Sequence, residues 1–224
     1  MSPDYPAGAG NRPSRHPERA AYDAATVHGI LDEGLVAHTA FVADGRAHLL
    51  PLLYLRRGAQ LYLHGSTGGH LFRMAARAGS VPVCVEVTLF DELVLARSYF
   101  DHSVNYRSVV VSGDASLLRD EAVKGEVMHD LVEHLVPGRS RHARPPTDEE
   151  LRQTAVLVLA LEEVSAKVRR GDPVDEPEDL DRPCWAGVVP LETTWGRPRP
   201  AANCPPDIEL PDYLQPLIGP GRSS

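Results

Sequence analysis

The fold is decided by residues 35–55, which read LVAHTAFVADGRAHLLPLLYL. Apolar, β-branched and small residues fill both halves, so residues 35–43 and 47–55 are each predicted to form a strand. Asp44 and Gly45 separate the halves, and an Asp-Gly pair supplies the positive backbone angles that a tight hairpin turn needs. The stretch therefore predicts two antiparallel neighbours.

The same pattern continues on both sides of this hairpin. Further strands are predicted over residues 60–64, 81–89, 93–100, 106–118 and 155–161, the second and third joined across Asp91-Glu92. Helices are predicted before Gly34, over residues 70–78 with Gly79 as cap, over 120–136, and after the capping box of Thr147 and Glu150. Short strands joined by tight turns favour an antiparallel barrel, mainly β with peripheral helices, over a doubly wound parallel sheet.

Composition limits the classes of partner. The net charge of −8 argues against a general nucleic-acid binder, because phosphate neutralisation needs a basic face. No apolar run approaches the ~20 residues that span a bilayer, and residues 1–16 lack the apolar segment of a signal peptide. The three cysteines form no CxxC pair, and Cys84, inside an apolar run, is predicted to be buried. We expect a cytoplasmic protein without a membrane partner.

The chain divides into three parts by composition. Residues 1–16 are polar and rich in Pro and Gly, which predicts a mobile tail. Residues 17–196 hold all the predicted strands and helices and suffice for one packed domain. Residues 197–224 are rich in proline, so they are predicted to form an extended arm that lies on the body or on a partner subunit.

Four segments combine residue types that could carry chemistry. Residues 61–70 pass through Gly, Ser and Thr into a helix start, which suits a phosphate but is also typical of an ordinary connection. Residues 96–109 crowd two arginines, a histidine and three aromatics between strands, as a ligand wall or a polar interface would. Residues 165–173 are basic and are either ligand contacts or a solvated strand end. Trp185, within residues 183–190, is either a packing anchor or a lid.

Ten histidines raise the question of a metal site. Neither HxxxH nor HExxH occurs, and His129 and His134 lie on different faces of their predicted helix. A Ser/His/Asp hydrolase finds no support either, because Gly-x-Ser-x-Gly is absent. We therefore assign no metal ligands.

Together and in order, these motifs resemble the pyridoxamine 5'-phosphate oxidase-like FMN-binding family, nearest its nitroimidazole-resistance-type flavin proteins. The resemblance covers residues 15–197. It rests on residues 31–34, 50–54, 63–66, 96–98, 102–108, 165–169 and 185–191.

The resemblance implies a six-stranded antiparallel split β-barrel that forms a homodimer, with one FMN in each of two clefts between the subunits. By position, Pro51, Leu52, Leu53 and Tyr54 would lie beside the flavin ring, and His64, Gly65 and Ser66 near its ribityl chain. Gly69, His70 and Leu71 mark the helix start at which the family binds the phosphate. The remaining implied cofactor contacts are Tyr106, Arg107, Ser108, Lys167 and Trp185, the last closing the cleft.

Two positions depart from the vitamin-oxidising members of the family. Where these carry an Arg-Lys pair for the phosphate, this chain has His70 and Leu71, and leucine forms no charge-assisted hydrogen bond. Either Arg73, His70 or Arg107 substitutes, or FMN binds weakly, or another cofactor is preferred. Tyr54 replaces a substrate-side Lys, which argues against pyridoxamine phosphate as the substrate.

These considerations lead to three hypotheses. The first is an FMN-dependent oxidoreductase of a small molecule, with a donor such as NAD(P)H. In it, His64 would transfer protons near the ring, because imidazole titrates near neutral pH. The second is a non-catalytic flavin or haem module with a sensing or carrier role, since several histidines lie on predicted strands. The third is an interaction protein whose barrel has lost its ligand.

Overall fold

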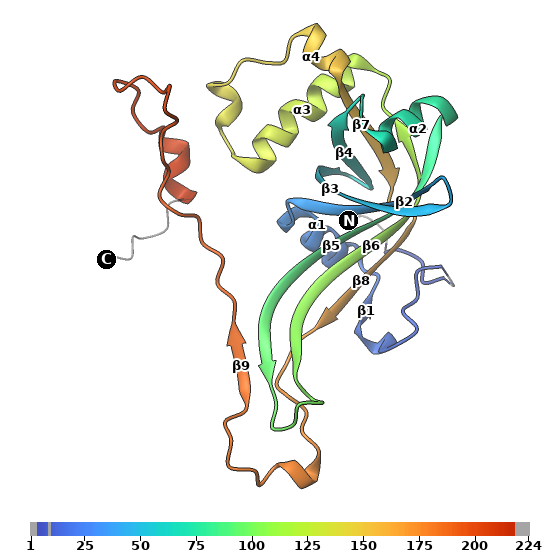
Figure 1. Ribbon diagram of the computed structural model, residues 1–224, viewed down its shortest axis with the longest axis vertical. Coiled ribbons are helices and arrows are strands. Elements are labelled where there is room, and N and C mark those ends of the chain that lie inside the picture. The colour runs from blue at the N-terminus through green and yellow to red at the C-terminus, as the bar shows by residue number, and fades with distance from the viewer. Residues whose placement is uncertain (1–3, 9, 218–224) are drawn as a thin grey trace.

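The computed structural model describes residues 4–8 and 10–217, and Figure 1 shows a barrel with peripheral helices. Its strands are β1 (Ala20–Ala21), β2 (Val36–Ala43), β3 (Arg46–Arg57), β4 (Gln60–Ser66), β5 (Ser80–Leu95), β6 (Ser103–Leu117), β7 (Thr154–Ala160), β8 (Glu163–Arg169) and β9 (Gly187–Pro190). Its helices are α1 (Ala24–Glu33), α2 (His70–Ala78), α3 (Glu121–Leu135) and α4 (Asp148–Gln153). Short 3-10 turns are η1 (Pro17–Arg19), η2 (Arg139–Arg141), η3 (Pro177–Asp179) and η4 (Asp212–Leu217).

Six strands close into a ring in the order β6, β7, β4, β3, β2 and β5, and β5 pairs with β6 to complete it. All these pairings are antiparallel. The barrel is split because β6 meets β7 only at Ser116 and Leu117, while the earlier part of β6 pairs with β8. The predicted six-stranded split barrel is thereby confirmed.

The hairpin of residues 35–55 forms as predicted. Strands β2 and β3 pair from Val36 opposite Leu53 to Ala43 opposite Arg46. Between them, Asp44 and Gly45 have φ angles of 51° and 71°, the left-handed conformation that an Asp-Gly turn adopts readily.

The predicted turn at Asp91-Glu92 is wrong. Strand β5 runs unbroken to Leu95, and its register with β6 shifts between Phe90 and Glu92. Such a shift is a β-bulge, which bends a strand without ending it. Two charged residues suggested a turn, but Asp91 is retained within the strand by hydrogen bonds from Arg107 of β6.

Strand β8 also went unrecognised, because its basic residues were interpreted as a strand end. Val164 and Ala166 face inward and are fully buried, while Ser165 and Lys167, which alternate with them, are partly exposed. This alternation is that of a half-buried strand. The short strand β9, which pairs with the end of β5, was missed as well.

The inside of the barrel is the hydrophobic core. Val83, Val85 and Val87 of β5 and Val109 and Val111 of β6 are all buried there. Cys84 was expected to join them, and that prediction is wrong. Successive strand residues point to opposite faces, so Cys84 points outward and is exposed.

A buried hydrogen bond ties α1 to the barrel. The Tyr54 hydroxyl donates to the Leu31 carbonyl oxygen at 2.6 Å, and both residues are fully buried. Burial raises the pKa of Tyr54, so the phenol stays protonated as the donor.

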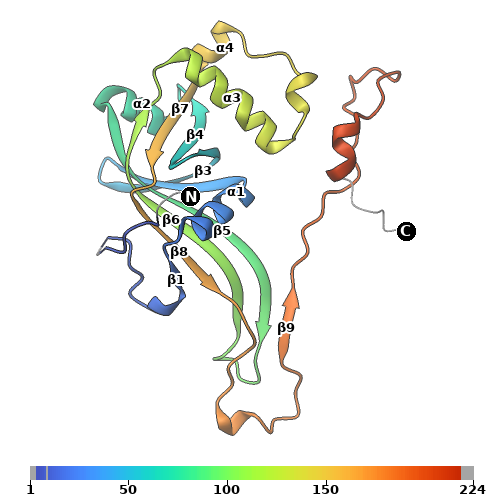
Figure 2. The same cartoon turned by 180° about the vertical axis from the view of Figure 1, so that it is seen from behind.

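The N-terminal and C-terminal segments, as far as the structure describes them, differ in how closely they pack on the barrel. In the segment expected to be a mobile tail, the Tyr5 hydroxyl lies 2.7 Å from Nε2 of His28, and the Asn11 amide donates to the Val164 carbonyl oxygen at 3.0 Å. Beyond β9 the arm stands apart from the barrel in both Figure 1 and Figure 2. It returns at η2, where Arg139 donates to the Tyr213 hydroxyl at 2.8 Å.

Candidate functional site

Strands β5, β6 and β8 turn a second face away from the core. Strand register aligns Cys84, Glu86 and Thr88 of β5 with Ser112, Val110 and Ser108 of β6, and these with Glu163, Ser165 and Lys167 of β8. We call these nine residues the outer face. All of them are exposed or partly exposed, and they mix hydroxyls, charges and apolar groups. The outer face is therefore accessible to a ligand or a partner.

A depression of about 280 Å³ lies on the outer face beside the N-terminal segment. The β6 and β8 residues of the outer face line it on one side, and residues 10–13 on the other. Ligand pockets usually measure roughly 300–1,000 Å³, so the depression alone would enclose only part of a cofactor. It brings together Ser108 and Lys167, two predicted cofactor contacts.

The depression carries a surplus of donors. The Lys167 ammonium group donates to the Arg15 carbonyl oxygen at 3.2 Å, and Arg12 lies at the rim. Ser108 and Ser165 add hydroxyls, while Glu163 is the single carboxylate among the lining residues. With Ser112, the lining has two cations and three hydroxyls against one carboxylate, which suits an anionic group such as a phosphate.

Arg107 lies on the other side of β6 from the depression. Its guanidinium donates to Glu33 at 2.9 Å and to Asp91 at 2.8 Å. The hydrogen bonds that Arg107 donates to Glu33 and Asp91 raise the pKa of Arg107, and the one that Glu33 accepts lowers the pKa of Glu33. The charge of Arg107 is therefore balanced within the chain.

The start of α2 packs tightly against β4. A Cβ on Gly65 would lie 2.2 Å from the Phe72 ring, so only glycine lets that ring approach the strand. Leu71 is fully buried in the core, and the Gly69 N–H donates to the Ser66 carbonyl oxygen at 2.9 Å. The loop is a compact connection, and the His70 side chain remains exposed.

The predicted ring-side residues of β3 divide between the two faces. Pro51 and Leu53 lie on the outside, opposite His38 and Val36 of β2. Leu52 packs against the core and Tyr54 is buried in it. Only Pro51 and Leu53 can therefore present a side chain to an external ligand.

His64 alternates with the buried Leu63 and so lies on the outside of β4. It is half-buried, and burial lowers its pKa below the ordinary histidine value. The ring is therefore neutral near pH 7, with one nitrogen able to accept a proton.

A pair of imidazoles lies between β3 and α2, of which only His70 is among the residues predicted to bind a cofactor. The ring centroids of His48 and His70 are 5.6 Å apart, with planes at 79°. The buried Phe41 stacks on His48 at 5.1 Å and meets His70 edge-on at 6.0 Å. The two histidines are far apart in sequence, so no spacing motif could have revealed them.

The remaining predicted contacts are more scattered. Tyr106 is on β6 opposite Arg169 of β8 and is half-buried. Trp185 is 67% exposed, packs over Gly187 next to β9, and does not line the depression. Arg12 and Ser165 line the depression but are not among the predicted site residues. Arg12 was assigned to the N-terminal tail. The outward position of Ser165 follows only from the alternation of β8, which was not recognised as a strand.

Two further observations concern the described residues only. They contain no group of three or more His, Cys, Asp or Glu side chains arranged as for a metal ion. Within the same residues, every helix is too short or too polar to cross a membrane.

The fold and the sequence together identify the family. The family model described as Pyridoxamine 5'-phosphate oxidase matches residues 23–168, from α1 to β8. The chain belongs to this family. Among curated proteins, none matches it.

Two solved structures of the family's fold are similar to this chain over most of its length. The flavocytochrome Anf3 from Azotobacter vinelandii is 36% identical, covers 97% of this chain and 100% of its own, and superposes with a TM-score of 0.88. The FAD and heme binding protein from Mycobacterium smegmatis is 33% identical, covers 90% of this chain and 98% of its own, with a TM-score of 0.84.

A more distant structure shares the fold alone. It is a Bacteroides thetaiotaomicron protein named for 5-nitroimidazole antibiotic resistance, 17% identical, with a TM-score of 0.55 over 66% of this chain and 86% of its own.

Proposed function

We propose that this protein is a homodimeric flavin- and haem-binding oxidoreductase. The observation that carries the proposal is the pair of solved structures more than 30% identical over at least 90% of the chain. One is named a flavocytochrome and the other an FAD and heme binding protein. The FMN expected from sequence is therefore joined by FAD as a candidate flavin, and haem becomes a second cofactor rather than an alternative.

The outer face fits the phosphate end of a flavin. Lys167, Arg12 and the hydroxyls of Ser108 and Ser165 converge on the depression and would hold an anionic group there. Pro51 and Leu53 offer apolar surface on the outside of neighbouring strands for a flat ring. The depression is too small to enclose a whole flavin, so a second copy would complete the cleft. This agrees with the homodimer expected from sequence.

The pair of His48 and His70 fits a haem iron. Imidazole nitrogen is a common ligand of haem iron, and the two rings meet edge to face from separate elements. The Phe41 ring fixes their orientation from one side. These two histidines would hold the iron, which leaves His64 free for proton transfer.

When bound, the flavin supplies hydride chemistry and the haem supplies one-electron chemistry. The chain's own residues would bind and orient the cofactors and exchange protons with the flavin. Lys167 and Ser108 would position the anionic end of the flavin, and the neutral His64 ring, on the outside of β4, would accept a proton at its free nitrogen. The three cysteines are free thiols in the structure, as suits a cytoplasmic protein.

Absorption spectroscopy of the purified protein tests this proposal. The wild type should show the two bands of a flavin together with a Soret band, and NADH or NADPH should bleach the flavin bands. His48→Ala and His70→Ala should each lose or shift the Soret band and keep the flavin, whereas His129→Ala on the exposed surface of α3 should keep both. A protein that takes up neither flavin nor haem would contradict the proposal.

A further inference from the structure

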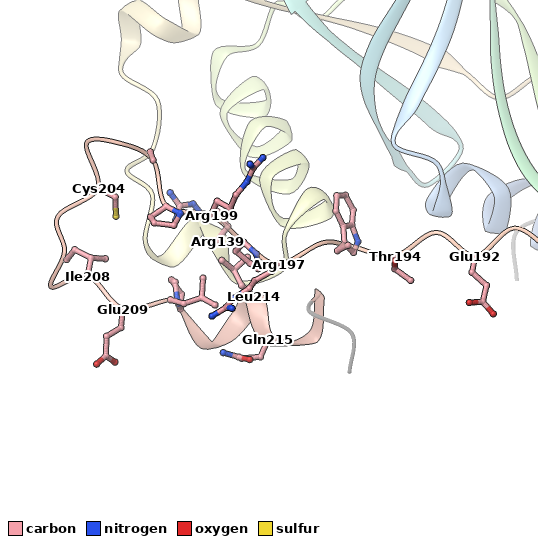
Figure 3. A pocket seen from close by; sticks show the side chains of 16 residues that line it. Arg139, Glu192, Thr194, Arg197, Arg199, Cys204, Ile208, Glu209, Leu214 and Gln215 are labelled. Atoms are coloured by element: carbon pink, nitrogen blue, oxygen red, sulfur yellow. The ribbon is translucent and has the colours of Figure 1, made fainter. Parts of the chain in front are cut away.

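A wide groove lies between the C-terminal arm and the loop after α3. It encloses about 1400 Å³ and is lined by Arg139 and by arm residues between Glu192 and Gln215. Figure 3 shows Arg139, Arg197 and Arg199 gathered in its middle, while Glu192 and Glu209 point away from them. We call this groove the arm groove.

The arm groove combines uncompensated positive charge with apolar surface. Among the described residues, no carboxylate forms an ion pair with Arg139, Arg197 or Arg199. Trp195 and Ile208, which also line the groove, are 61% and 60% exposed. Apolar side chains beside arginine are the composition that protein-binding surfaces favour.

The opposite composition occurs in residues 171–182, which link β8 to β9 and read GDPVDEPEDLDR. Four exposed carboxylates in this stretch have no cation within ion-pair distance in the described part of the chain: Asp172, Glu176, Glu178 and Asp181. Val174 and Leu180 beside them are 79% and 56% exposed. We call residues 171–182 the acidic tip.

Within one chain the acidic tip and the arm groove cannot meet. Figure 1 shows the tip at the lower end of the long axis and the C-terminal segment in the upper half. The arm is held at both ends, because Gly187 of β9 pairs with Leu95 of β5, and Tyr213 is bound by Arg139. An acidic tip that fills the arm groove must therefore come from another molecule.

We propose that the acidic tip of one protomer docks into the arm groove of a second copy, and that the second tip docks reciprocally into the first groove. A two-fold axis relates any contact between two copies to an identical second contact. Groove and tip are complementary in charge, and each adds exposed apolar groups that the contact would bury. This inference rests on the proposed homodimer and says which segments interlock in it.

A free anion, such as a nucleotide phosphate, is the competing occupant. It would satisfy the three arginines of the arm groove but would leave Trp195 and Ile208 exposed. It would also leave the charges and apolar groups of the acidic tip without a role. The second copy accounts for both surfaces at once.

Charge reversal tests the interlock. The variant Arg197→Glu/Arg199→Glu and the variant Glu176→Arg/Glu178→Arg each place like charges opposite one another. Because such juxtaposition is strongly unfavourable, we expect each to weaken dimerisation by about tenfold or more in sedimentation velocity at moderate salt. The four-fold variant, in which both signs are reversed, should return to near the wild-type dimerisation constant. Arg119→Glu/Arg152→Glu, on exposed arginines elsewhere, is the control and should leave the constant unchanged.

The outcomes separate this inference from the proposed function. Dimers that withstand both reversals would overturn the interlock, while flavin and haem spectra of the same samples still test the cofactors. Weakening without recovery in the four-fold variant would also overturn it, because the two segments would then affect dimerisation without contacting each other. A wild type that is monomeric at all concentrations would overturn the dimer and the interlock together. Thermal unfolding of each variant verifies that the barrel itself is intact.

Discussion

The inside and the outside of the barrel are built by alternate residues of the same strands, yet they differ in kind. Along β5, Val83, Val85 and Val87 fill the core, while Cys84 and Glu86 between them face outward. The inner residues share one property, apolar volume, so apolar β-branched residues at alternate positions are enough to predict them. The outer residues share no property apart from accessibility, and their chemistry depends on which strands lie next to them.

Stability and ligand binding can therefore be altered separately in this fold. Tyr54 is the sole titratable member of the core cluster among the described residues. The donors that suit a phosphate, Lys167, Ser108 and Ser165, all lie outside. Substitutions on the inside should therefore change the free energy of unfolding, and substitutions on the outside should change cofactor binding.

The largest effect is expected from truncating a core side chain. Leu63→Ala in β4 removes a fully buried side chain and should lower the free energy of unfolding by about 2–5 kcal/mol. Leu49→Ala in β3 makes the same chemical change at a side chain that is 60% exposed, and should cost less than about 1 kcal/mol. Urea unfolding measures both. Equal losses in the free energy of unfolding would contradict the distinction between the inside and the outside of the barrel.

A smaller effect should follow the loss of the buried hydrogen bond between α1 and β3. Tyr54→Phe keeps the ring but leaves the buried Leu31 carbonyl oxygen without its donor, which should cost about 1–3 kcal/mol. The matched variant is Tyr62→Phe, whose hydroxyl donates to the Gln60 side chain at the surface. If the two variants have the same free energy of unfolding, the Tyr54 hydroxyl does not stabilise the packing of α1 on the barrel.

A pH titration should reveal a still smaller effect confined to the outside. Backbone N–H groups of Gly138 and Ser140 donate to the Glu133 carboxylate at 2.7 and 2.9 Å and lower its pKa to about 2. A depressed carboxyl pKa stabilises the fold above the unfolded value, and this stabilisation is lost as pH falls through the folded value. The difference in Tm between wild type and Glu133→Gln should therefore be constant near neutral pH and shrink from about pH 4.5 towards pH 2. A constant difference down to pH 2 would contradict the assigned contacts.

The barrel could be predicted from sequence to a large extent, because its signals are local. The Asp44-Gly45 turn and the apolar strands act over a few residues and led to the antiparallel barrel, while its six strands and its split were implied by the family resemblance. The bulge at Asp91 was mistaken for a turn, because the Arg107 guanidinium that retains Asp91 in β5 comes from another strand.

The candidate site was harder to predict because it is assembled across strands. Ser108 and Lys167 were identified by resemblance and do lie together, opposite each other on β6 and β8. Arg12 reaches the same depression from a segment without regular structure, and His48 meets His70 through tertiary packing. Leu71 and Tyr54 occupy family cofactor positions, but their side chains are part of the core.

The most direct test of the account is the affinity of Lys167→Ala for FMN and FAD, measured by fluorescence titration beside the unfolding free energy of the same variant. We expect the variant to unfold with a free energy close to that of the wild type, because Lys167 is not part of the core. We also expect flavin binding weaker by about ten- to a hundredfold, since a hydrogen bond to a charged group contributes roughly 1.5–3 kcal/mol. Arg119→Ala should change neither quantity. Unchanged flavin affinity in a folded Lys167→Ala protein would contradict a flavin site on the outer face.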